Sequence, residues 1–403
     1  MHRAPLALSA AVLAIAARAA AEDGRRADEE TELDVVPVAG GSSDIGYGGG
    51  AVGALTRFVR GDPHAWQWRL EASALITFRV LPSFGVPYQD HWIQLIVPGL
   101  LDGKLRVQAR VAFTQETVIS YYGLGNAAPA PANPTAPAYL YGRTHPMLEG
   151  YARGTLGPHL FEVAGGSLTL NWLDVPANGR VASDMRSASP GVRSLLGDAR
   201  THAVGILQQS LVWDSRDDEV VPRLGMWHEV DLRMSPRLGD AMPYPYCELL
   251  AIARGYVPLG DRFVIAGRAL GDALFGRPPF YQLAEYDDTY AIGGSSGIRG
   301  VPAARYYGKA KLIANLEARA DVARLRFVDK PWAVAVVAFF DAGRLWADWS
   351  ANPGLDGTGL GLKWGTGLGL RVQQGKAFVV RGDVAWSPDA LPIGAYFAAG
   401  ETF

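Results

Sequence analysis

The stretch from Lys309 to Asp321 reads KAKLIANLEARAD, and it decides the fold class. Its even positions, from Ala310 to Ala320, are all alanine or leucine, whereas its odd positions carry charges or an amide except at Ile313. Strict alternation with a period of two indicates a β-strand with one apolar face and one polar face.

Two further stretches alternate in the same way: 66–79 reads WQWRLEASALITFR, and 104–116 reads KLRVQARVAFTQE. A soluble β-sandwich also produces such alternation. Strand length and the chemistry of the polar face distinguish it from a membrane-spanning β-barrel. Runs of about 11–14 residues exceed the usual length of globular strands and suit a tilted membrane strand. Polar faces that carry both charge signs suit a water-filled lumen. Trp332 and Trp346 bracket an apolar run, as an interfacial aromatic girdle does.

In a lipid bilayer every backbone donor and acceptor needs a partner, so membrane strands must close into a barrel. The sequence therefore predicts an all-β, antiparallel transmembrane β-barrel of about 16 strands. The predicted strands cover residues 32–40, 46–60, 66–80, 90–99, 103–121, 146–156, 158–174, 202–215, 225–237, 244–258, 261–274, 307–324, 332–346, 360–373, 376–387 and 393–403.

The predicted connections alternate between short and long. Short periplasmic turns and long external loops are typical of outer-membrane barrels. An even strand number places both chain ends in the periplasm. The short connections are 60–65, 100–102, 157 and 373–375, and the long ones are 123–145, 174–201 and 275–306.

Composition excludes several other classes of protein and of binding site. The chain has 403 residues, a formal net charge of −2 and 19% charged residues, so no nucleic-acid partner is indicated. The single cysteine, Cys247, excludes an internal disulfide and a zinc site built from several thiolates. No run of about 18 apolar residues occurs, which excludes helical membrane spans.

The beginning of the chain resembles a secretory signal peptide. Met1–Arg3 forms a charged start, Ala4–Ala17 an apolar run, and Ala19-x-Ala21 a small-residue cleavage pattern. The alternative is a membrane-anchoring helix, but the apolar run is short and rich in alanine. We therefore expect a signal peptide over 1–21, a short acidic periplasmic segment over 22–31, and the barrel over 32–403.

Three motifs occur in a fixed order in the second half of the chain. The first lies within IGGSSGIRGV at 292–301, the second within FFDAG at 339–343, and the third is WDSRDD at 213–218. Their distinguishing residues are Gly297, Ile298, Arg299 and Gly300; Phe339, Asp341 and Gly343; and Asp214, Arg216, Asp217 and Asp218 with Pro222 and Gly225.

Together these motifs resemble the bacterial surface-antigen superfamily of outer-membrane barrels, which includes the BamA assembly factor and two-partner-secretion transporters. The resemblance implies that the loop bearing Arg299 folds into the lumen and that Arg299 contacts Asp341. The alternation agrees, because Phe339, Asp341 and Gly343 fall on the lumenal face if Phe340 faces lipid. The alternative for Arg299 is a solvated loop tip. Val301 replaces the aromatic residue that the family usually has there.

The remaining site predictions concern the turn, the lumenal charges and the end of the chain. Asp214, Arg216, Asp217, Pro222 and Gly225 are expected to form a periplasmic turn, with metal binding by its aspartates as the alternative. The charges of the lumenal wall are expected either to surround the loop or to solvate a pore: Glu317, Arg319, Arg381 and Asp383. Phe397 and Phe403, in phase on a final strand, resemble the signature that targets barrels to their assembly machinery.

Catalysis is not indicated. A barrel phospholipase needs a Ser–His pair near the external rim, and His91, His145, His202 and His228 have no serine in such an arrangement. No G-x-S-x-G motif occurs. We expect no enzyme activity and no cofactor or metal.

Two functions follow from the resemblance. The first is an outer-membrane factor that inserts or passes polypeptide (or lipid), with outer-membrane lipids and the barrel assembly machinery as partners. The family usually gathers substrates with periplasmic POTRA domains, and the sequence shows none, so a separate periplasmic protein is an expected partner. The alternative is a passive pore or structural barrel.

Overall fold

The computed structural model describes residues 29–59, 66–79, 84–130, 133, 135–187, 189–198, 201–286, 289–327, 330–350, 352–374, 378–389 and 393–403. The predicted signal peptide and most of the predicted acidic segment lie outside these residues. So do the predicted short connection at 60–65 and part of the one at 373–375.

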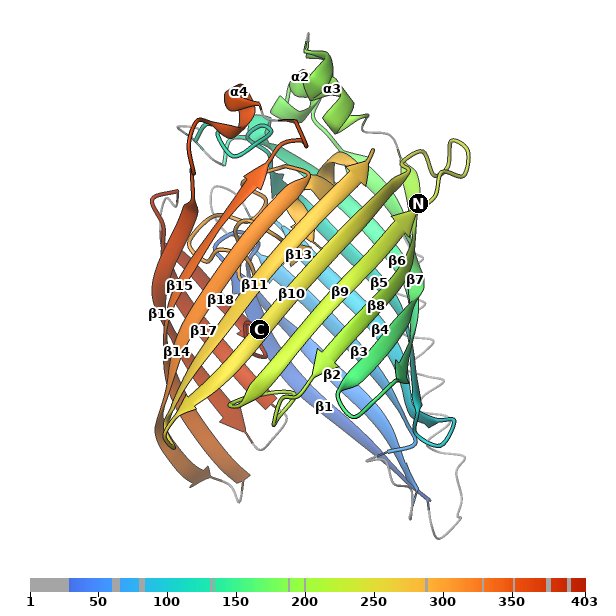
Figure 1. Cartoon of the computed structure of the whole chain (residues 1–403), viewed down its shortest axis with the longest axis vertical. Coiled ribbons are helices and arrows are strands. Elements are labelled where there is room, and N and C mark those ends of the chain that lie inside the picture. Colours follow the sequence, from blue (N-terminus) through green and yellow to red (C-terminus); the bar gives the residue numbers. More distant parts are fainter. Residues whose placement is uncertain are drawn as a thin grey trace.

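Sixteen antiparallel strands form a closed barrel, which confirms the predicted fold class and strand number. Each strand pairs with its neighbours in the sequence, except that β11 pairs with β14 around a long loop and β18 pairs with β1 to close the barrel (Figure 1). The barrel strands are β1 Glu29–Ser42, β2 Gly46–Val59, β3 Trp68–Phe78, β4 Tyr88–Leu100, β5 Leu105–Ser120, β6 Leu140–Thr155, β7 Leu160–Asp174, β8 His202–Asp214, β9 Gly225–Ser235, β10 Tyr246–Leu259, β11 Phe263–Gly276, β14 Ala310–Phe327, β15 Lys330–Trp346, β16 Lys363–Gln374, β17 Phe378–Trp386 and β18 Gly394–Ala399.

The period-two alternation separates the two faces of the wall. On β15, Val336 and Phe340 are 43% and 48% exposed on the outer surface, whereas Phe339 and Asp341 are buried inside the barrel. On β14, Leu316 faces outward and its neighbours in the chain are buried. Apolar side chains outside and charged side chains inside are the pattern that a membrane barrel requires.

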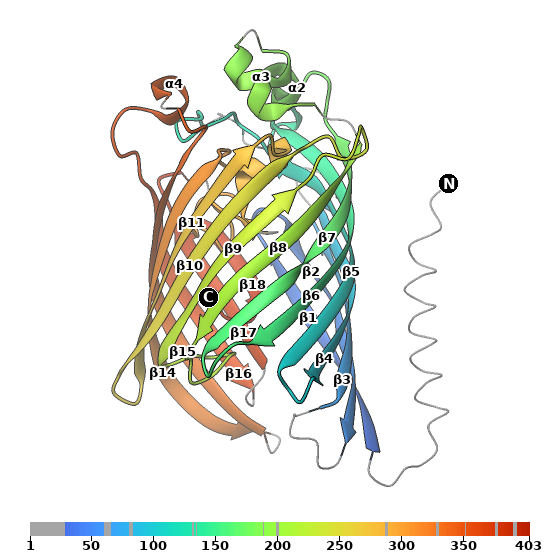
Figure 2. The same ribbon diagram turned by 45° about the vertical axis from the view of Figure 1, so that its right-hand side comes forward.

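The connections at the two ends of the barrel differ in length. One end carries the short helices and the long loops, and we call it the helical end; the other carries the shorter turns, and we call it the turn end (Figures 1 and 2). Among the described residues no helix is long and apolar enough to cross a membrane. The elements outside the wall are η1 Pro137–Tyr139, α2 Arg180–Met185, α3 Pro190–Leu196, η2 Phe280–Ala284, α4 Pro353–Asp356, and the two-stranded sheet of β12 Glu285–Tyr286 and β13 Thr289–Tyr290.

The seam between the first and last strands is short. Among the described residues, β1 and β18 pair at Gly41 with Phe397 and at Ser42 with Tyr396. On its other side β1 pairs with β2 along its whole length, from Glu29 to Ser42. From 29 to 40, the edge of β1 that faces the seam has no strand partner in the described part of the chain.

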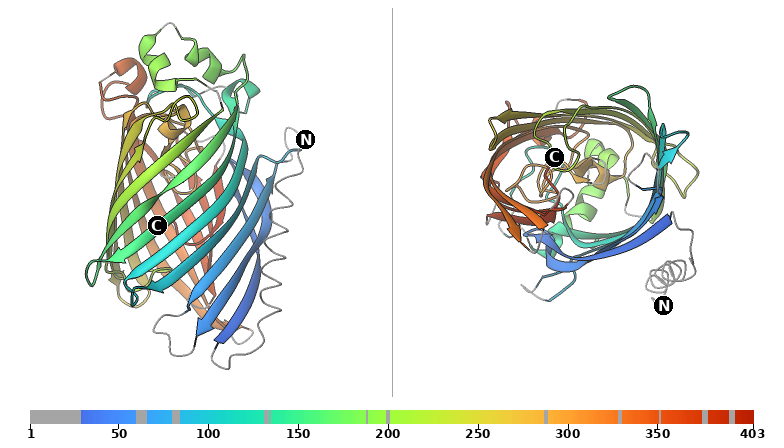
Figure 3. Two further views of the ribbon diagram at one scale, coloured as in Figure 1. Left: turned by 90° about the vertical axis from the view of Figure 1, so that its right-hand side faces the viewer. Right: turned by 90° about the horizontal axis from the view of Figure 1, so that it is seen from below.

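Several predicted strand boundaries are wrong. The first strand begins at Glu29 and not at residue 32, and β6 begins at Leu140 and not at residue 146. The last strand was expected over 393–403 with Phe403 in phase with Phe397, but β18 ends at Ala399. Beyond it the chain turns at Gly400, which has a φ of +82°, and runs into the lumen (Figure 3). Phe397 stays on the outer surface, whereas Phe403 is buried.

Candidate functional site

The candidate site lies where the tip of the β11–β14 loop, residues 277–309, meets the lumenal wall. Arg299 at this tip donates two parallel hydrogen bonds to Asp341 of β15, from Nε at 2.8 Å and from Nη2 at 2.9 Å. The backbone N–H of Arg299 donates a third to the same carboxylate, at 3.0 Å. Paired guanidinium–carboxylate bonds are among the strongest that side chains form. The contact expected between Arg299 and Asp341 is therefore present.

Two more carboxylates surround the same guanidinium. Nη1 of Arg299 donates to Glu317 at 2.7 Å and lies 3.7 Å from Asp383, and the guanidinium carbon lies 3.5 Å from the centre of the Phe339 ring. Arg299 is 0% exposed. Burial alone would lower the pKa of Arg299, but the hydrogen bonds that it donates to Asp341 and the charges of the carboxylates raise it. Arg299 is thus a fully buried, fully charged side chain and not a solvated tip.

The tip fits against the wall because two glycines leave room for it. Gly300 has a φ of +94°, and a Cβ there would lie 2.9 Å from the backbone of Trp386. Gly365 of β16 pairs with Asp341, and a Cβ on Gly365 would overlap the carbonyl oxygen of Arg299. Gly365 was not among the predicted site residues, since its role depends on the register of β15 and β16.

The other predicted tip residues support this position. The carbonyl of Gly297 accepts a 2.8 Å hydrogen bond from the side-chain amide of Asn315 on β14. Ile298 and Val301 are fully buried in one apolar cluster, so valine fills the position where the family has an aromatic residue. A Cβ on Gly343 would lie 3.0 Å from the side chain of Ile298.

A network of arginines and carboxylates extends the contact into the wall; we call it the latch cluster. Arg319 binds Glu317 at 2.9 Å, and Arg371 binds Asp383 at 2.7 Å and Glu317 at 3.4 Å. The sequence predicted four of these wall charges near the loop, namely Glu317, Arg319, Arg381 and Asp383. It did not predict Arg371. The members of the latch cluster are Arg299, Glu317, Arg319, Asp341, Arg371, Arg381 and Asp383.

The base of the same loop binds the opposite wall. Glu285 of β12 accepts hydrogen bonds from Nη1 of Arg143 on β6 at 2.9 and 3.2 Å, and both side chains are nearly inaccessible. Nε of Arg143 donates to Asn171 at 2.9 Å. Tyr290 donates to Glu116 of β5 at 2.8 Å. We call these contacts the wall anchor; the pair Arg143–Glu285, separated by 142 residues, had no signal in the sequence.

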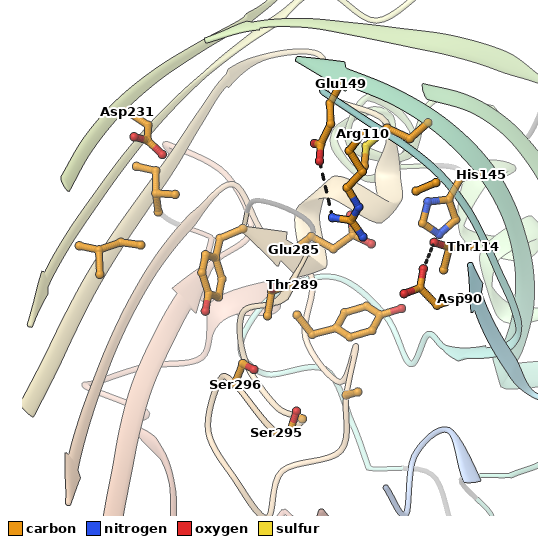
Figure 4. Close-up of a pocket in the computed structure, with 18 of the residues that line it drawn as sticks. Asp90, Arg110, Thr114, His145, Glu149, Asp231, Glu285, Thr289, Ser295 and Ser296 are labelled. Atoms are coloured by element: carbon orange, nitrogen blue, oxygen red, sulfur yellow. Dashed lines mark hydrogen bonds and ion pairs between the residues drawn. The ribbon is translucent and has the colours of Figure 1, made fainter. Parts of the chain in front are cut away.

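A cavity of about 950 Å³ lies in the lumen beside the loop. Figure 4 shows side chains of β4, β5 and β6 that point into it, with loop residues such as Ser295 on the facing side. Arg110 forms an ion pair with Glu149 at 3.6 Å, and Thr114 donates to Asp90 at 2.9 Å. The loop thus occupies part of the lumen, and polar side chains line the remaining space.

Aromatic residues pack between the loop and the helical end. Tyr307 of the loop contacts Tyr121 edge to face at 4.8 Å and shares a 3.2 Å hydrogen bond with Tyr141. Tyr121 also donates to Asp184 of α2 at 3.0 Å. This buried cluster includes Val181 and Leu196 of the two helices.

The predicted turn between β8 and β9 satisfies its own carboxylates. Asp214 holds the guanidinium of Arg216 through both oxygens, each at 2.9 Å. Asp217 accepts two backbone N–H groups of the turn at 2.9 and 3.0 Å. Pro222 is buried, and Gly225 begins β9 with a φ of +103°. These contacts support a structural role for the aspartates of this turn.

Two of the histidines considered as catalytic candidates contact other side chains of the barrel. His202 contacts the hydroxyl of Tyr281 at 2.9 Å, and His145 lies 3.5 Å from Glu116. Among the described residues, no group of three or more His, Cys, Asp or Glu side chains is arranged to hold a metal ion.

Comparison with solved structures gives two similar folds. The crystal structure of BamA from Haemophilus ducreyi lacking POTRA domains 1-3 has a TM-score of 0.59 and 13% identity, covering 93% of this chain and 70% of that one. CdiB from Escherichia coli has a TM-score of 0.55 and 14% identity, covering 94% of this chain and 64% of that one. This chain therefore spans less than two thirds of CdiB. At these identities the similarity shows the fold.

The sequence comparisons show the family. A search of curated proteins gave no match. The model of the Omp85 superfamily domain matches residues 150–403, which is more than half of the chain. This region contains the tip, the strand that binds it and the β8–β9 turn, which carried the resemblance seen in the sequence. The chain therefore belongs to the Omp85 superfamily, and it is an outer-membrane β-barrel protein.

Proposed function

We propose that this protein inserts or passes polypeptide at the outer membrane through the seam between β1 and β18, while the latch cluster holds the loop in the lumen. The observation that carries the proposal is the edge of β1 from 29 to 40, which has no strand partner among the described residues. An exposed strand edge presents backbone donors and acceptors that another strand can pair with. In a bilayer such groups need partners, so the edge favours strand addition at this point.

The loop supports the proposal because it is bound to the seam as well as to the wall. Tyr396 of β18 accepts a 2.9 Å hydrogen bond from the backbone N–H of Gly300, next to Arg299. A change in the seam therefore moves a direct partner of the loop tip. This coupling suits a barrel whose lumen and seam act together.

A disulfide across the seam tests the proposal. In a Cys247→Ser background, Ser42→Cys with Tyr396→Cys joins positions that pair in register. The matched control, Ala51→Cys with Ala74→Cys, joins β2 and β3 inside the continuous wall. We expect the oxidised seam pair to fail to restore the surface proteins lost from a deletion strain, and reduction to restore them. Full complementation by the locked seam would refute strand passage there.

The second candidate, a passive pore with the loop as its constriction, is favoured by the polar cavity beside the loop. Single-channel conductance of the purified protein separates the two. A latched barrel is expected to open rarely and erratically, with more frequent openings in Arg299→Ala. A large, steady conductance that the substitution leaves unchanged would identify the passive pore.

A further inference from the structure

Residues 401–403, which we call the tail, lie inside the barrel and not in its wall. Figure 3 shows the C-terminal end of the described chain within the ring of strands. Glu401, Thr402 and Phe403 follow the turn at Gly400 and contact side chains from β10, β11, β14, β16 and β17.

Phe403 occupies an apolar slot bordered by cations. Its ring packs with Tyr256, Val264 and Ala266. The guanidinium carbons of Arg268 and Arg319 lie 5.4 and 5.6 Å from the centre of the ring. Cations within about 6 Å of an aromatic face are attracted to it. Nη2 of Arg319 also donates to the backbone oxygen of Phe403 at 3.3 Å.

The two preceding side chains bind the latch cluster. The hydroxyl of Thr402 accepts hydrogen bonds from Arg381 at 2.5 Å, Arg299 at 3.3 Å and Arg371 at 3.4 Å. The carboxylate of Glu401 accepts one from Nε of Arg371 at 3.0 Å. The same carboxylate lies 3.7 Å from Arg319. Each side chain of the tail thus has partners of complementary chemistry.

Charge balance shows what the pocket requires. The latch cluster has four arginines and three carboxylates, and Glu401 supplies the fourth negative charge. Without the tail, one buried arginine lacks a counter-charge. Arg268 adds another positive charge, since its hydrogen-bond partners among the described residues, including Asn315 and Tyr286, are neutral. Buried unpaired charge is costly, so the vacated pocket favours an acidic group next to an aromatic ring.

We propose that this pocket is a receptor for a polypeptide segment with an acidic, a hydroxyl and an aromatic residue in succession. The tail occupies it as an internal ligand, and an incoming segment of that chemistry takes its place. The tail can leave because Gly400 joins it to a six-residue strand that pairs with β1 at two described positions. The polypeptide nature of the incoming ligand rests on the proposed function.

Binding of a labelled peptide containing Gly-Glu-Thr-Phe to the purified full chain in detergent micelles tests this, with fluorescence anisotropy as the measurement. Glu401→Ala, Thr402→Ala and Phe403→Ala together vacate the pocket. We expect this variant to bind the peptide at least tenfold more tightly than the unaltered chain. A peptide with Gln-Thr-Ala in place of Glu-Thr-Phe is expected to lose that gain.

Two arginines of β14 provide the matched site controls in the vacated variant. Arg319→Gln removes contacts to the tail, and we expect a loss of affinity of at least tenfold. Arg324→Gln changes an arginine whose side chain is 65% exposed and pairs with Asp321, and binding is expected to stay unchanged. Phe403→Ala alone, which keeps the polar contacts of the tail, is a second background if the triple variant does not fold; an affinity gain of at least threefold is expected there.

Equal, weak binding of both peptides to the folded vacated variants, or equal effects of the two arginine substitutions, would overturn the receptor and leave the tail as a structural contact. Peptide binding in micelles involves no transport, so its outcome is independent of the outcome of the seam experiment. Loss of peptide binding with a working seam refutes the receptor alone, whereas peptide binding with a seam that tolerates the disulfide refutes the proposed function alone.

Discussion

Arg299 stays charged in the lumen because carboxylates replace the water that burial removes. Its guanidinium donates two parallel hydrogen bonds to Asp341, which lies 42 residues further along the chain, and its Nη1 donates another to Glu317. A charge buried in this way is stable only with all of its partners, so the latch is sensitive to the loss of any single member.

Arg299→Ala leaves Asp341 and Glu317 buried without this cation. We expect a loss of about 3–5 kcal/mol of stability, the usual cost of breaking a buried pair. The measurement is the temperature at which the folded barrel loses its fast mobility on cold gel electrophoresis. Arg324→Ala, an exposed arginine of β14, is the control and is expected to leave this temperature unchanged. Equal values for both variants would contradict a latch.

Asp44, in the turn between β1 and β2, gives a pH dependence. Burial raises its pKa from 3.8 to about 6, although the backbone of Ala303 and the charge of Arg79 oppose the shift. Between these values the folded protein binds more protons than the unfolded chain, so the contribution of Asp44 to stability falls as pH rises from 3.8 to about 6 and is constant above.

Asp44→Asn, which resembles the protonated acid, should remove this dependence. The variant is expected to match the unaltered protein below pH 4 and to be more stable at pH 7. The apparent melting temperature across this range is the measurement, with Asp240→Asn in an exposed loop as the control. A variant that is less stable at pH 7 would show that the ionised carboxylate stabilises the turn.

At the scale of elements, the loop from 277 to 309 is held at two points. Its tip binds β14 and β15, and its base binds β5 and β6 through the wall anchor. The loop therefore spans the lumen between walls that lie on different sides of the barrel (Figure 3). The apolar contacts of Ile298 and Val301 add to the hold at the tip.

Glu285→Gln tests the wall anchor. The substitution leaves Arg143 buried without its carboxylate, so we expect a destabilisation of about 3–5 kcal/mol, similar to that from loss of the latch. Cold gel mobility after heating is again the measurement, and Asp240→Asn is the exposed control. A loss below about 0.5 kcal/mol, typical of a surface change, would show that the anchor does not hold the loop.

At the scale of the whole molecule, the two attachments act on one conducting space. Either Arg299→Ala or Glu285→Gln weakens one attachment and leaves the other intact, and each is expected to give more frequent but short openings in planar bilayers. The double variant weakens both attachments and is expected to give long-lived openings beyond the sum of the two single effects. Additive opening frequencies would mean that the loop does not act as one body.

Much of this organisation was predictable from the sequence. Period-two alternation follows from the two faces of a strand, so it gave the strands, their outward and inward residues, and their number. The approach of Arg299 to Asp341 was predicted from family motifs and the alternation of β15. The last strand is shorter than the alternation predicts, because the chain turns at Gly400 although Phe403 continues the apolar phase of Phe397.

The sequence by itself determined the closed barrel and the tip residue that enters it, because both depend on local patterns and motifs. Only the tertiary structure decided that Arg143 meets Glu285, that Gly365 makes room for the tip, and that residues 401–403 leave the wall for the lumen. These contacts join strands that are distant in sequence but face one another across the barrel. Closure and register set such distances, and neither is encoded in the neighbourhood of a single residue.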